Sequence, residues 1–252
     1  MKIALLGYGK MGKAVEAVAL ERNHTIAVTI DNNEEWASRG EQLRGCDVAI
    51  DFSQPDMAVD NIRRCFAIGV PVVVGTTGWY DHLDEMVALC ESGKKSLFVA
   101  SNFSIGMNIM FDLNRRLARL MNRYADYDVT ISETHHIHKL DAPSGTAITL
   151  ANDMIEALDR KQNWTLETTL HPDEKDDAPA HANVAENSVG VTSIRQGEVA
   201  GVHVVTYDSP IDTITVTHSA KNRKGLALGA VLAAEFLAAH PGYHTMLDLL
   251  EA

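Results

Sequence analysis

Short apolar runs and longer runs with helical spacing take turns along the first hundred residues. Uninterrupted apolar runs are typical of parallel strands buried on both faces, and the amphipathic runs between them are typical of covering helices. This alternation predicts an α/β domain with a doubly wound parallel sheet. We expect strands over 2–6, 25–30, 47–52, 70–74 and 96–100, and helices over 13–22, 55–68 and 80–90.

The pattern changes near Ser104, where we place a domain boundary. The later strands alternate apolar and polar residues, which predicts an α+β domain with a mostly antiparallel or mixed open sheet. The polar stretch 168–188 is expected to be an exposed loop that contributes to oligomer contacts or to a lid. The predicted elements are helices over 108–123, 147–158 and 226–238, and strands over 127–134, 190–195, 201–207 and 212–219.

Composition narrows the classes of partner. The chain has 252 residues and a formal charge of -12, which argues against nucleic acid and anionic membranes because both attract a basic face. The most apolar late run, 226–239, contains Glu235 and is shorter than the roughly 20 residues of a membrane span. The chain has three cysteines, Cys46, Cys65 and Cys90, whose spacing suggests no disulfide pairs, and this fits a reducing cytoplasm. We therefore expect a cytoplasmic protein that binds small molecules or other protein chains.

A glycine-rich loop follows the first predicted strand and precedes the first helix. In a dinucleotide-binding fold, Gly7 permits the tight turn, Gly9 lets a pyrophosphate approach, and Gly12 lets the helix pack on the strand. Asp31 ends the second strand, where an acidic group binds the adenosine ribose. The alternative is a structural turn without a ligand. Two more polar loops, 75–78 and 101–104, follow strands at the same edge and are either ligand loops or plain connections.

The densest chemistry lies in residues 133–146, which read ETHHIHKLDAPSGT. Glu133 and His135 share one face of an extended segment, because alternate side chains point the same way. Pro143 is expected in the first turn of the following helix. The free amides near Ser144 and the positive end of the helix dipole favour a carboxylate or phosphate.

Three interpretations of this stretch remain open. Its histidines are common metal ligands, although no fourth ligand is evident and Lys139 would repel a cation. They are also compatible with a structural cluster that satisfies buried hydrogen bonds. The third interpretation joins a histidine general acid to a lysine and an anion-binding helix terminus, and it uses every polar group of the stretch.

The same stretch closely resembles the signature of the 4-hydroxy-tetrahydrodipicolinate reductase family, also called dihydrodipicolinate reductases. The resemblance extends to further motifs that stand in family order: Gly75-Thr76-Thr77-Gly78, Ser101 to Gly106, Ile194 to Gly197 with Gly201 and His203, and Thr217-His218. It implies a Rossmann-like domain over 1–104 that is completed by 217–252, and a substrate-binding and tetramerisation domain over 105–216. It also implies reduction of a small cyclic dicarboxylate in lysine and diaminopimelate synthesis, by a cytoplasmic homotetramer that uses NADH or NADPH.

The resemblance further implies residue roles. His135 matches the proton donor and Lys139 the second catalytic group, while His136, Gly145 and Thr146 match substrate carboxylate contacts. No metal is implied. The segments that match the cofactor site contain Gly7, Tyr8, Gly9, Lys10, Met11, Gly12, Asp31, Gly75, Thr76, Thr77, Ala100, Ser101, Asn102 and Phe103.

One departure concerns cofactor choice. Many members of the family carry a basic residue directly after the acidic one, where Asn32 stands in this chain. We therefore expect NADH to be favoured, although Lys10 leaves NADPH open. Three alternatives are a nicotinamide-sensing protein without turnover, a metal-dependent hydrolase, and a Rossmann reductase acting on another small dicarboxylate.

Overall fold

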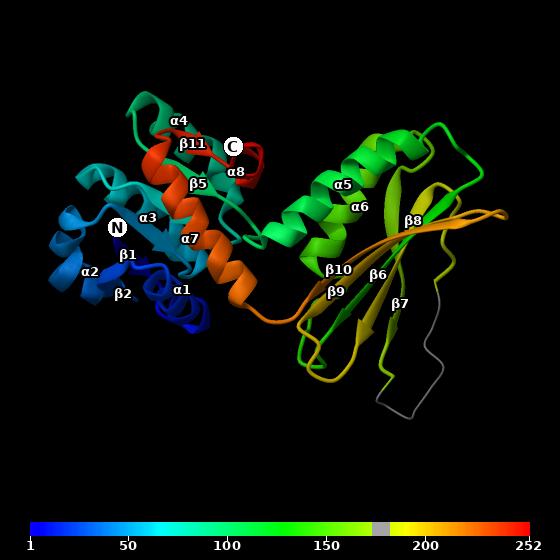
Figure 1. Ribbon diagram of the computed structural model, residues 1–252, viewed down its shortest axis with the longest axis horizontal. Helices are drawn as coiled ribbons and strands as arrows, with labels where there is room; N and C mark the ends of the chain where they lie inside the picture. The colour runs from blue at the N-terminus through cyan, green and yellow to red at the C-terminus, as the bar shows by residue number, and fades with distance from the viewer. Residues whose placement is uncertain (173–181) are drawn as a thin grey trace. The chain divides into compact units, whose positions relative to one another are not determined.

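The chain folds into two compact units in a computed structural model that describes residues 1–172 and 182–252 (Figure 1). Unit 1 comprises Met1–Asn108 and Arg223–Ala252, and unit 2 comprises Ile109–Asn222. The sequence placed the return to the first domain at residue 217. In the structure the last strand of unit 2 continues to Ala220, so the return comes later.

Unit 1 is built on a six-stranded sheet in which every pairing is parallel. Strand β1 lies between β2 and β3, so the chain leaves it toward one side and later returns on the other. Such a switch point opens a crevice at the carboxyl ends of the strands. The strands, in sheet order, are β11 (Tyr243–His244), β5 (Leu97–Val99), β4 (Val72–Val74), β3 (Val48–Asp51), β1 (Lys2–Leu6) and β2 (Thr25–Ile30).

Helices cover both faces of this sheet, each over its own apolar core (Figure 1). On one face α7, from the far end of the chain, packs beside α1 over buried residues that include Ile3 and Ile50. The sequence missed α2, α8 and β11, which are too short for a clear periodicity. The helices are α1 (Lys10–Glu21), α2 (Asn33–Arg39), α3 (Pro55–Ile68), α4 (Leu83–Ser92), α7 (Lys224–Ala239) and α8 (Met246–Glu251), with 3-10 turns at Gly40–Gly45 and Tyr80–His82.

Unit 2 is a mixed five-stranded sheet in the order β10-β9-β6-β8-β7. Strands β10, β9 and β6 pair antiparallel, whereas β6, β8 and β7 pair parallel. Helix α5 (Ile105–Met121) leads into this unit, and α6 connects β6 to β7. The elements are β6 (Asp128–His135), α6 (Gly145–Ala157), β7 (Asn163–Leu170), β8 (Ser188–Arg195), β9 (Gly201–Asp208) and β10 (Thr213–Ala220).

Strand β7 corrects the expectation of an exposed loop over 168–188. Thr168 belongs to β7 and Ser188 to β8, and both are buried. The threonine-rich β7 lacks the apolar alternation that marks the other strands, so its pattern gave no signal. Residues 173–181 of the expected loop lie outside the described residues. No described helix is long and apolar enough to cross a bilayer.

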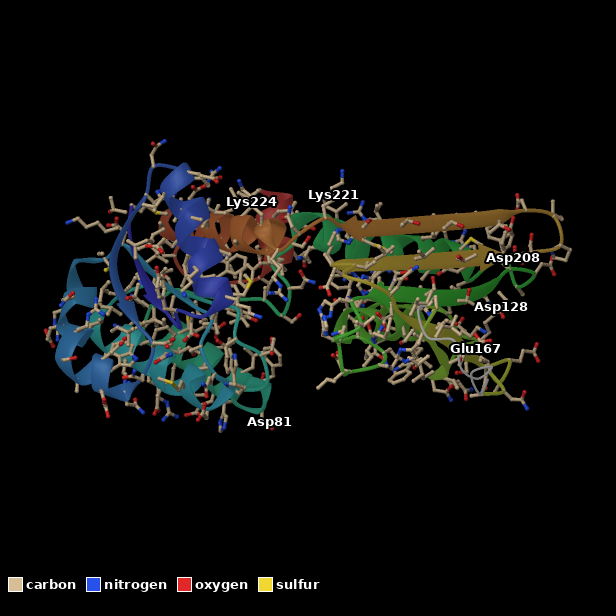
Figure 2. The ribbon with its side chains drawn as sticks, turned by 90° about the horizontal axis from the view of Figure 1, so that it is seen from below. Asp81, Asp128, Glu167, Asp208, Lys221 and Lys224 are labelled. Carbon is tan, nitrogen blue, oxygen red and sulfur yellow. The ribbon has the colours of Figure 1, made fainter. Side chains whose placement is uncertain are left out.

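The register of unit 2 fixes which ends of its strands meet. Asp128 at the start of β6 pairs with Asp208 at the end of β9, and both lie at one end of the sheet (Figure 2). Alternate residues such as Ile131 and Val205 are buried on the same face. The other end of β6, where His135 stands, therefore meets the start of β9 and the end of β8.

Candidate active site

Two rows of polar side chains cross the sheet of unit 2 at the end of β6. Glu133 pairs with His203 on β9 and with Ser193 on β8. Two residues further along, His135 pairs with Arg195 on β8. Because residues two apart share a face, these rows lie on the face that carries the buried apolar side chains. The sheet therefore brings together groups that are about 60 residues apart in sequence.

Glu133 is the centre of this arrangement and is completely buried. Its Oε2 accepts a hydrogen bond from Nδ1 of His135. Its Oε1 accepts from Nη2 of Arg195 at 2.9 Å and from the amide of Ser144 at 3.3 Å. Burial alone would raise the pKa of Glu133, but the donors of His135 and Arg195 outweigh it and lower the pKa to about 2. Glu133 is therefore an anion at every physiological pH.

The orientation of His135 follows from this contact. A carboxylate has no hydrogen to donate, so Nδ1 of His135 carries the hydrogen and Nε2 is left for other chemistry. Nε2 faces Gly201, where a Cβ atom would lie only 3.1 Å away. Gly201 also has φ +154, a conformation that side chains disfavour. Glycine at this position therefore leaves space beside the free nitrogen.

His203 packs against His135 with an edge-to-face ring contact of 5.2 Å between centroids. Burial, and then the neighbouring His135, lower the pKa of His203 to about 3, so its ring is neutral near pH 7. Its Nε2 lies 3.1 Å from Oγ of Ser144, and its Nδ1 is buried without a partner among the described residues. His203 is thus a neutral side chain that contacts the start of α6.

Helix α6 begins beside this cluster. Ser144 is its N-cap, and its Oγ accepts from the amide of Ala147 at 3.2 Å. The amides of Gly145 and Thr146 have no acceptor among residues 1–172 and 182–252. Apart from its chain neighbours and the backbone of α6, no described atom lies within 4 Å of a Cβ built on Gly145, so there is open space beside this residue. Pro143 precedes the N-cap and is not in the first helical turn, which corrects that expectation.

Lys139 and His136 lie in the turn after β6, where the expected extended segment has already ended. The ammonium of Lys139 contacts both oxygens of Asp141, at 2.7 and 2.8 Å. Burial would raise the pKa of Asp141, but the Lys139 hydrogen bond brings it below its ordinary value. Nδ1 of His136 is buried and has no partner in the described part of the chain. Nε and Nη2 of Arg195 brace this turn by donating to the carbonyls of Lys139 and Asp141.

Glu133, His135 and His203 also form a possible metal-ligand group, with atoms within 4.8 Å of one another. The donor set fits a metal poorly, because both oxygens of Glu133 already accept hydrogen bonds and the guanidinium of Arg195 lies 2.9 Å away. A divalent cation would have to displace these contacts and sit beside a fixed positive charge. The geometry favours proton chemistry at this site.

The glycine loop of unit 1 has the geometry of a pyrophosphate site. Gly7 has φ +86, and a Cβ on it would lie 2.3 Å from the carbonyl oxygen of Phe52. A Cβ on Gly12 would likewise lie 2.3 Å from the carbonyl oxygen of Gly7. Gly9 is the N-cap of α1 and meets nothing within 4 Å. There is therefore open space beside Gly9 at the N-terminus of α1, which is compatible with the anion site expected there.

Asp31 stands at the end of β2 and accepts a hydrogen bond from the amide of Tyr8 at 2.7 Å. Its own amide donates to Oε2 of Glu35 at 2.8 Å. Asn32, in the position of interest for cofactor choice, caps α2 by accepting from the amide of Glu35 at 2.9 Å. Two carboxylates therefore surround the end of β2, and Asn32 adds no positive charge.

Asp51, which the sequence did not single out, organises the loop after β4. It is fully buried and accepts from Oγ1 of Thr76 at 2.6 Å, Oγ of Ser53 at 2.7 Å and Nδ2 of Asn61 at 2.8 Å. Burial raises the pKa of Asp51 against these hydrogen bonds. The side chain of Thr76 is thereby turned inward, and its carbonyl oxygen accepts from Nε1 of Trp79 at 2.8 Å.

The other predicted cofactor residues divide between surface and core. Thr77 and Ser101 are exposed, and Gly75 and Asn102 are half-buried. Ala100 and Phe103 are buried, and the ring of Phe103 packs against Phe52 and Phe98. For these two residues, contact with a cofactor would have to involve the backbone.

Two protein-family models together match nearly the whole chain. The model of the dihydrodipicolinate reductase C-terminus matches residues 106–250, and that of the N-terminus matches residues 1–103. The chain belongs to the dihydrodipicolinate reductase family. This confirms the resemblance drawn from residues 133–146 and from the other motifs that stand in family order along the chain.

Relatives within this family are similar over their full length. A 4-hydroxy-tetrahydrodipicolinate reductase from Christiangramia forsetii is 44% identical over 250 residues, covering 99% of this chain and 98% of its own. The protein of the same name from Akkermansia muciniphila is 35% identical, covering 96% and 94%. A solved dipicolinate-bound dihydrodipicolinate reductase from Paenisporosarcina sp. TG-14 has a TM-score of 0.74 at 23% identity and covers 98% of each chain. This structural match confirms the α/β fold with its second, mixed sheet.

Proposed function

We propose that this chain reduces 4-hydroxy-tetrahydrodipicolinate to tetrahydrodipicolinate, with loss of water, in lysine and diaminopimelate synthesis. Family membership and the names of the full-length relatives support the reaction. The observation that carries the proposal is the cluster at the end of β6. It places a histidine with a free Nε2 in the same unit as the open amides of α6. A proton donor and a carboxylate seat are what a cyclic dicarboxylate substrate needs.

The substrate side of the reaction belongs to unit 2. The amides of Gly145 and Thr146, at the positive end of the α6 dipole, would bind a carboxylate of the substrate. His136 would add a further polar contact. His135, protonated at Nε2, would donate its proton to the substrate as negative charge develops, and Lys139 would stabilise that charge after leaving Asp141.

The cofactor side belongs to unit 1. A bound reduced nicotinamide supplies the hydride. Gly7, Gly9 and Gly12 would cradle the pyrophosphate at the start of α1, and Asp31 would accept from the ribose hydroxyls. The loops after β4 and β5 would flank the nicotinamide half, with Asp51 fixing the first of them through Thr76.

We further propose that NADH is favoured over NADPH. Asp31 and Glu35 place two carboxylates at the end of β2, and Asn32 is occupied in capping α2. A 2′-phosphate carries negative charge and would be repelled there. Lys10, exposed in the glycine loop, could offset this repulsion, so some use of NADPH is expected.

The assembly is proposed to be a cytoplasmic homotetramer formed through unit 2. Free thiols at all three cysteines are compatible with a reducing compartment. The face of the sheet opposite Ile131 and Val205 carries uncharged side chains that suit a contact between sheets. Central positions on that face are Thr130, Ser132, Val204, Thr206, Thr215 and Thr217.

The test is loss of reduced-nicotinamide absorbance when the protein meets pyruvate and aspartate semialdehyde that the upstream synthase has condensed. Consumption should require the synthase and be faster with NADH than with NADPH. His135→Gln and Lys139→Ala should lower kcat by about a hundredfold or more, because each removes a group that acts on the reacting atoms. A folded protein that binds NADH without consuming it would refute the proposed reaction.

A further inference from the structure

The buried carboxylate of Glu133 lies outside the set of groups that touch substrate in the proposed reaction, yet it contacts three of the elements that build the site. Its Oε2 faces β6 through His135. Its Oε1 faces β8 through Arg195 and the start of α6 through the amide of Ser144. The two oxygens therefore serve different purposes, one toward the proton donor and one toward the carboxylate seat.

We infer that Glu133 is a positioning residue that fixes the tautomer of His135 through Oε2 and the start of α6 through Oε1. Its kinetic consequence rests on the proposed reduction, whereas the tautomer of His135 does not. Because Glu133 is a pure acceptor, the ring of His135 must present hydrogen at Nδ1, and Nε2 alternates between carrying and releasing the proton.

No other described group performs this task for His135. His203, on the neighbouring strand, meets His135 through the edge of its ring and directs Nε2 to Ser144. Arg195 donates to Glu133 and to the carbonyls of Ile194, Lys139 and Asp141, and cannot accept. Lys139 contacts Asp141. Among residues 1–172 and 182–252, only Glu133 thus presents an acceptor to the ring of His135.

The division between the two oxygens makes Glu133→Gln an informative substitution. Arg195 is a charged donor and should keep the single oxygen of the new amide at the Oε1 position, where the Ser144 amide also donates. The amide nitrogen then stands at the Oε2 position and points its hydrogens at Nδ1 of His135. The neutral ring should respond by carrying its hydrogen on Nε2. Nε2 then has no lone pair to take up the proton that His135 must donate in the next turnover.

The expected kinetic result is a split between kcat and KM. With the α6 contacts kept, KM for the substrate should stay within about threefold, while kcat should fall about a hundredfold, as is typical when a general acid is lost or misdirected. A residue that merely stabilised the fold would change both or neither. Ser144→Ala is the complementary variant, because it alters the α6 cap and should raise KM without changing the tautomer of His135.

The tautomer itself can be measured without turnover. Nitrogen-15 NMR of histidine-labelled protein distinguishes Nδ1–H from Nε2–H rings, and His135→Asn assigns the signal. In the wild type at alkaline pH, His135 should carry hydrogen on Nδ1, and in Glu133→Gln it should carry hydrogen on Nε2. The matched control is Glu198→Gln, which removes an exposed carboxylate 2.9 Å from Nε2 of His138 and should leave both kcat and the His135 signal unchanged.

Two results would overturn the inference. One is a wild-type His135 with hydrogen on Nε2, which decides the matter even when Glu133→Gln does not fold. The other is a folded Glu133→Gln enzyme whose kcat stays within about threefold of the wild type. Absence of turnover in the wild type would instead refute the proposed reaction, and the NMR result would still decide the role of Glu133.

Discussion

Acidification should destabilise unit 2 through His203. This side chain is 5% exposed, and its ring has a neutral hydroxyl partner at Ser144. Burial is the main cause that lowers its pKa from the ordinary 6.5 to about 3, and the positive potentials of His135, His218 and Lys139 add to it. Glu133 opposes them but does not reverse the shift. Protonation of His203 is therefore much easier in the unfolded chain than in the folded one.

The sign and the size of the effect follow from linkage. Below pH 6.5 His203 binds a proton in the unfolded state but not in the folded state. The contribution of His203 to the free energy of unfolding is therefore fully present above that pH and is lost as the pH falls toward about 3. The whole interval of about 3.5 pH units corresponds to about 5 kcal/mol, and the part between pH 6.5 and 5 to about 2 kcal/mol. Glu133, whose pKa lies at about 2, adds a further loss only below about pH 4.5.

Urea unfolding between about pH 7 and pH 5 measures this loss. Trp164 is the one tryptophan in unit 2, so a background with Trp36→Phe and Trp79→Phe reports that unit by fluorescence. His203→Gln removes the titrating ring and is the matched variant. The wild type should lose about 2 kcal/mol more than the variant over this range. Equal losses in the two proteins would refute the argument that His203 is held neutral by its surroundings.

Further predictions concern the helix caps and metals. Ser144→Ala should raise KM for the substrate several-fold and lower the stability of unit 2 by about 1 kcal/mol, because α6 loses its cap; an unchanged KM would contradict the carboxylate seat. Asn32→Arg should raise the NADPH to NADH ratio of kcat/KM while lowering the stability of unit 1 by about 1 kcal/mol. Asn32→Ala should show the same loss of stability without the gain. Chelators should leave activity unchanged, and restoration of a lost activity by zinc would revive the metal interpretation.

Local features were predictable from the sequence because their causes are local. The glycines from Gly7 to Gly12 predict a tight turn and a helix packed closely against the strand. The structure shows both, because a Cβ on Gly7 or on Gly12 would clash with the neighbouring backbone. Helix α3 begins at Pro55 and ends before Gly69, the two residue types that mark such boundaries. The shared face of Glu133 and His135 likewise follows from the period of two, and their hydrogen bond realises it.

Partnerships across the sheet were not predictable in this way. Arg195 meets Glu133 because β8 pairs parallel with β6, and on its other side β8 pairs with β7, the strand without an apolar signal. His203 meets Ser144 through the antiparallel pairing of β9 with β6. Both residues were recognised in the sequence only as parts of family motifs. One amino-acid sequence does not reveal the order of the strands in the sheet, so it cannot show which residues Arg195 and His203 will contact.

Stability alone does not explain why a carboxylate stands at position 133. Withdrawing the Glu133 carboxylate from water is costly, and the hydrogen bonds of His135 and Arg195 more than offset that cost only relative to the protonated acid. Apolar groups of similar volume often replace a buried ion pair without loss of stability, so such a pair is weak support for a structural role. An apolar side chain, however, would leave Nδ1 of His135 and the amide of Ser144 without an acceptor. The carboxylate is therefore best understood through what it orients, namely the proposed proton donor His135 on one oxygen and, on the other, the start of α6, where we propose that the substrate binds.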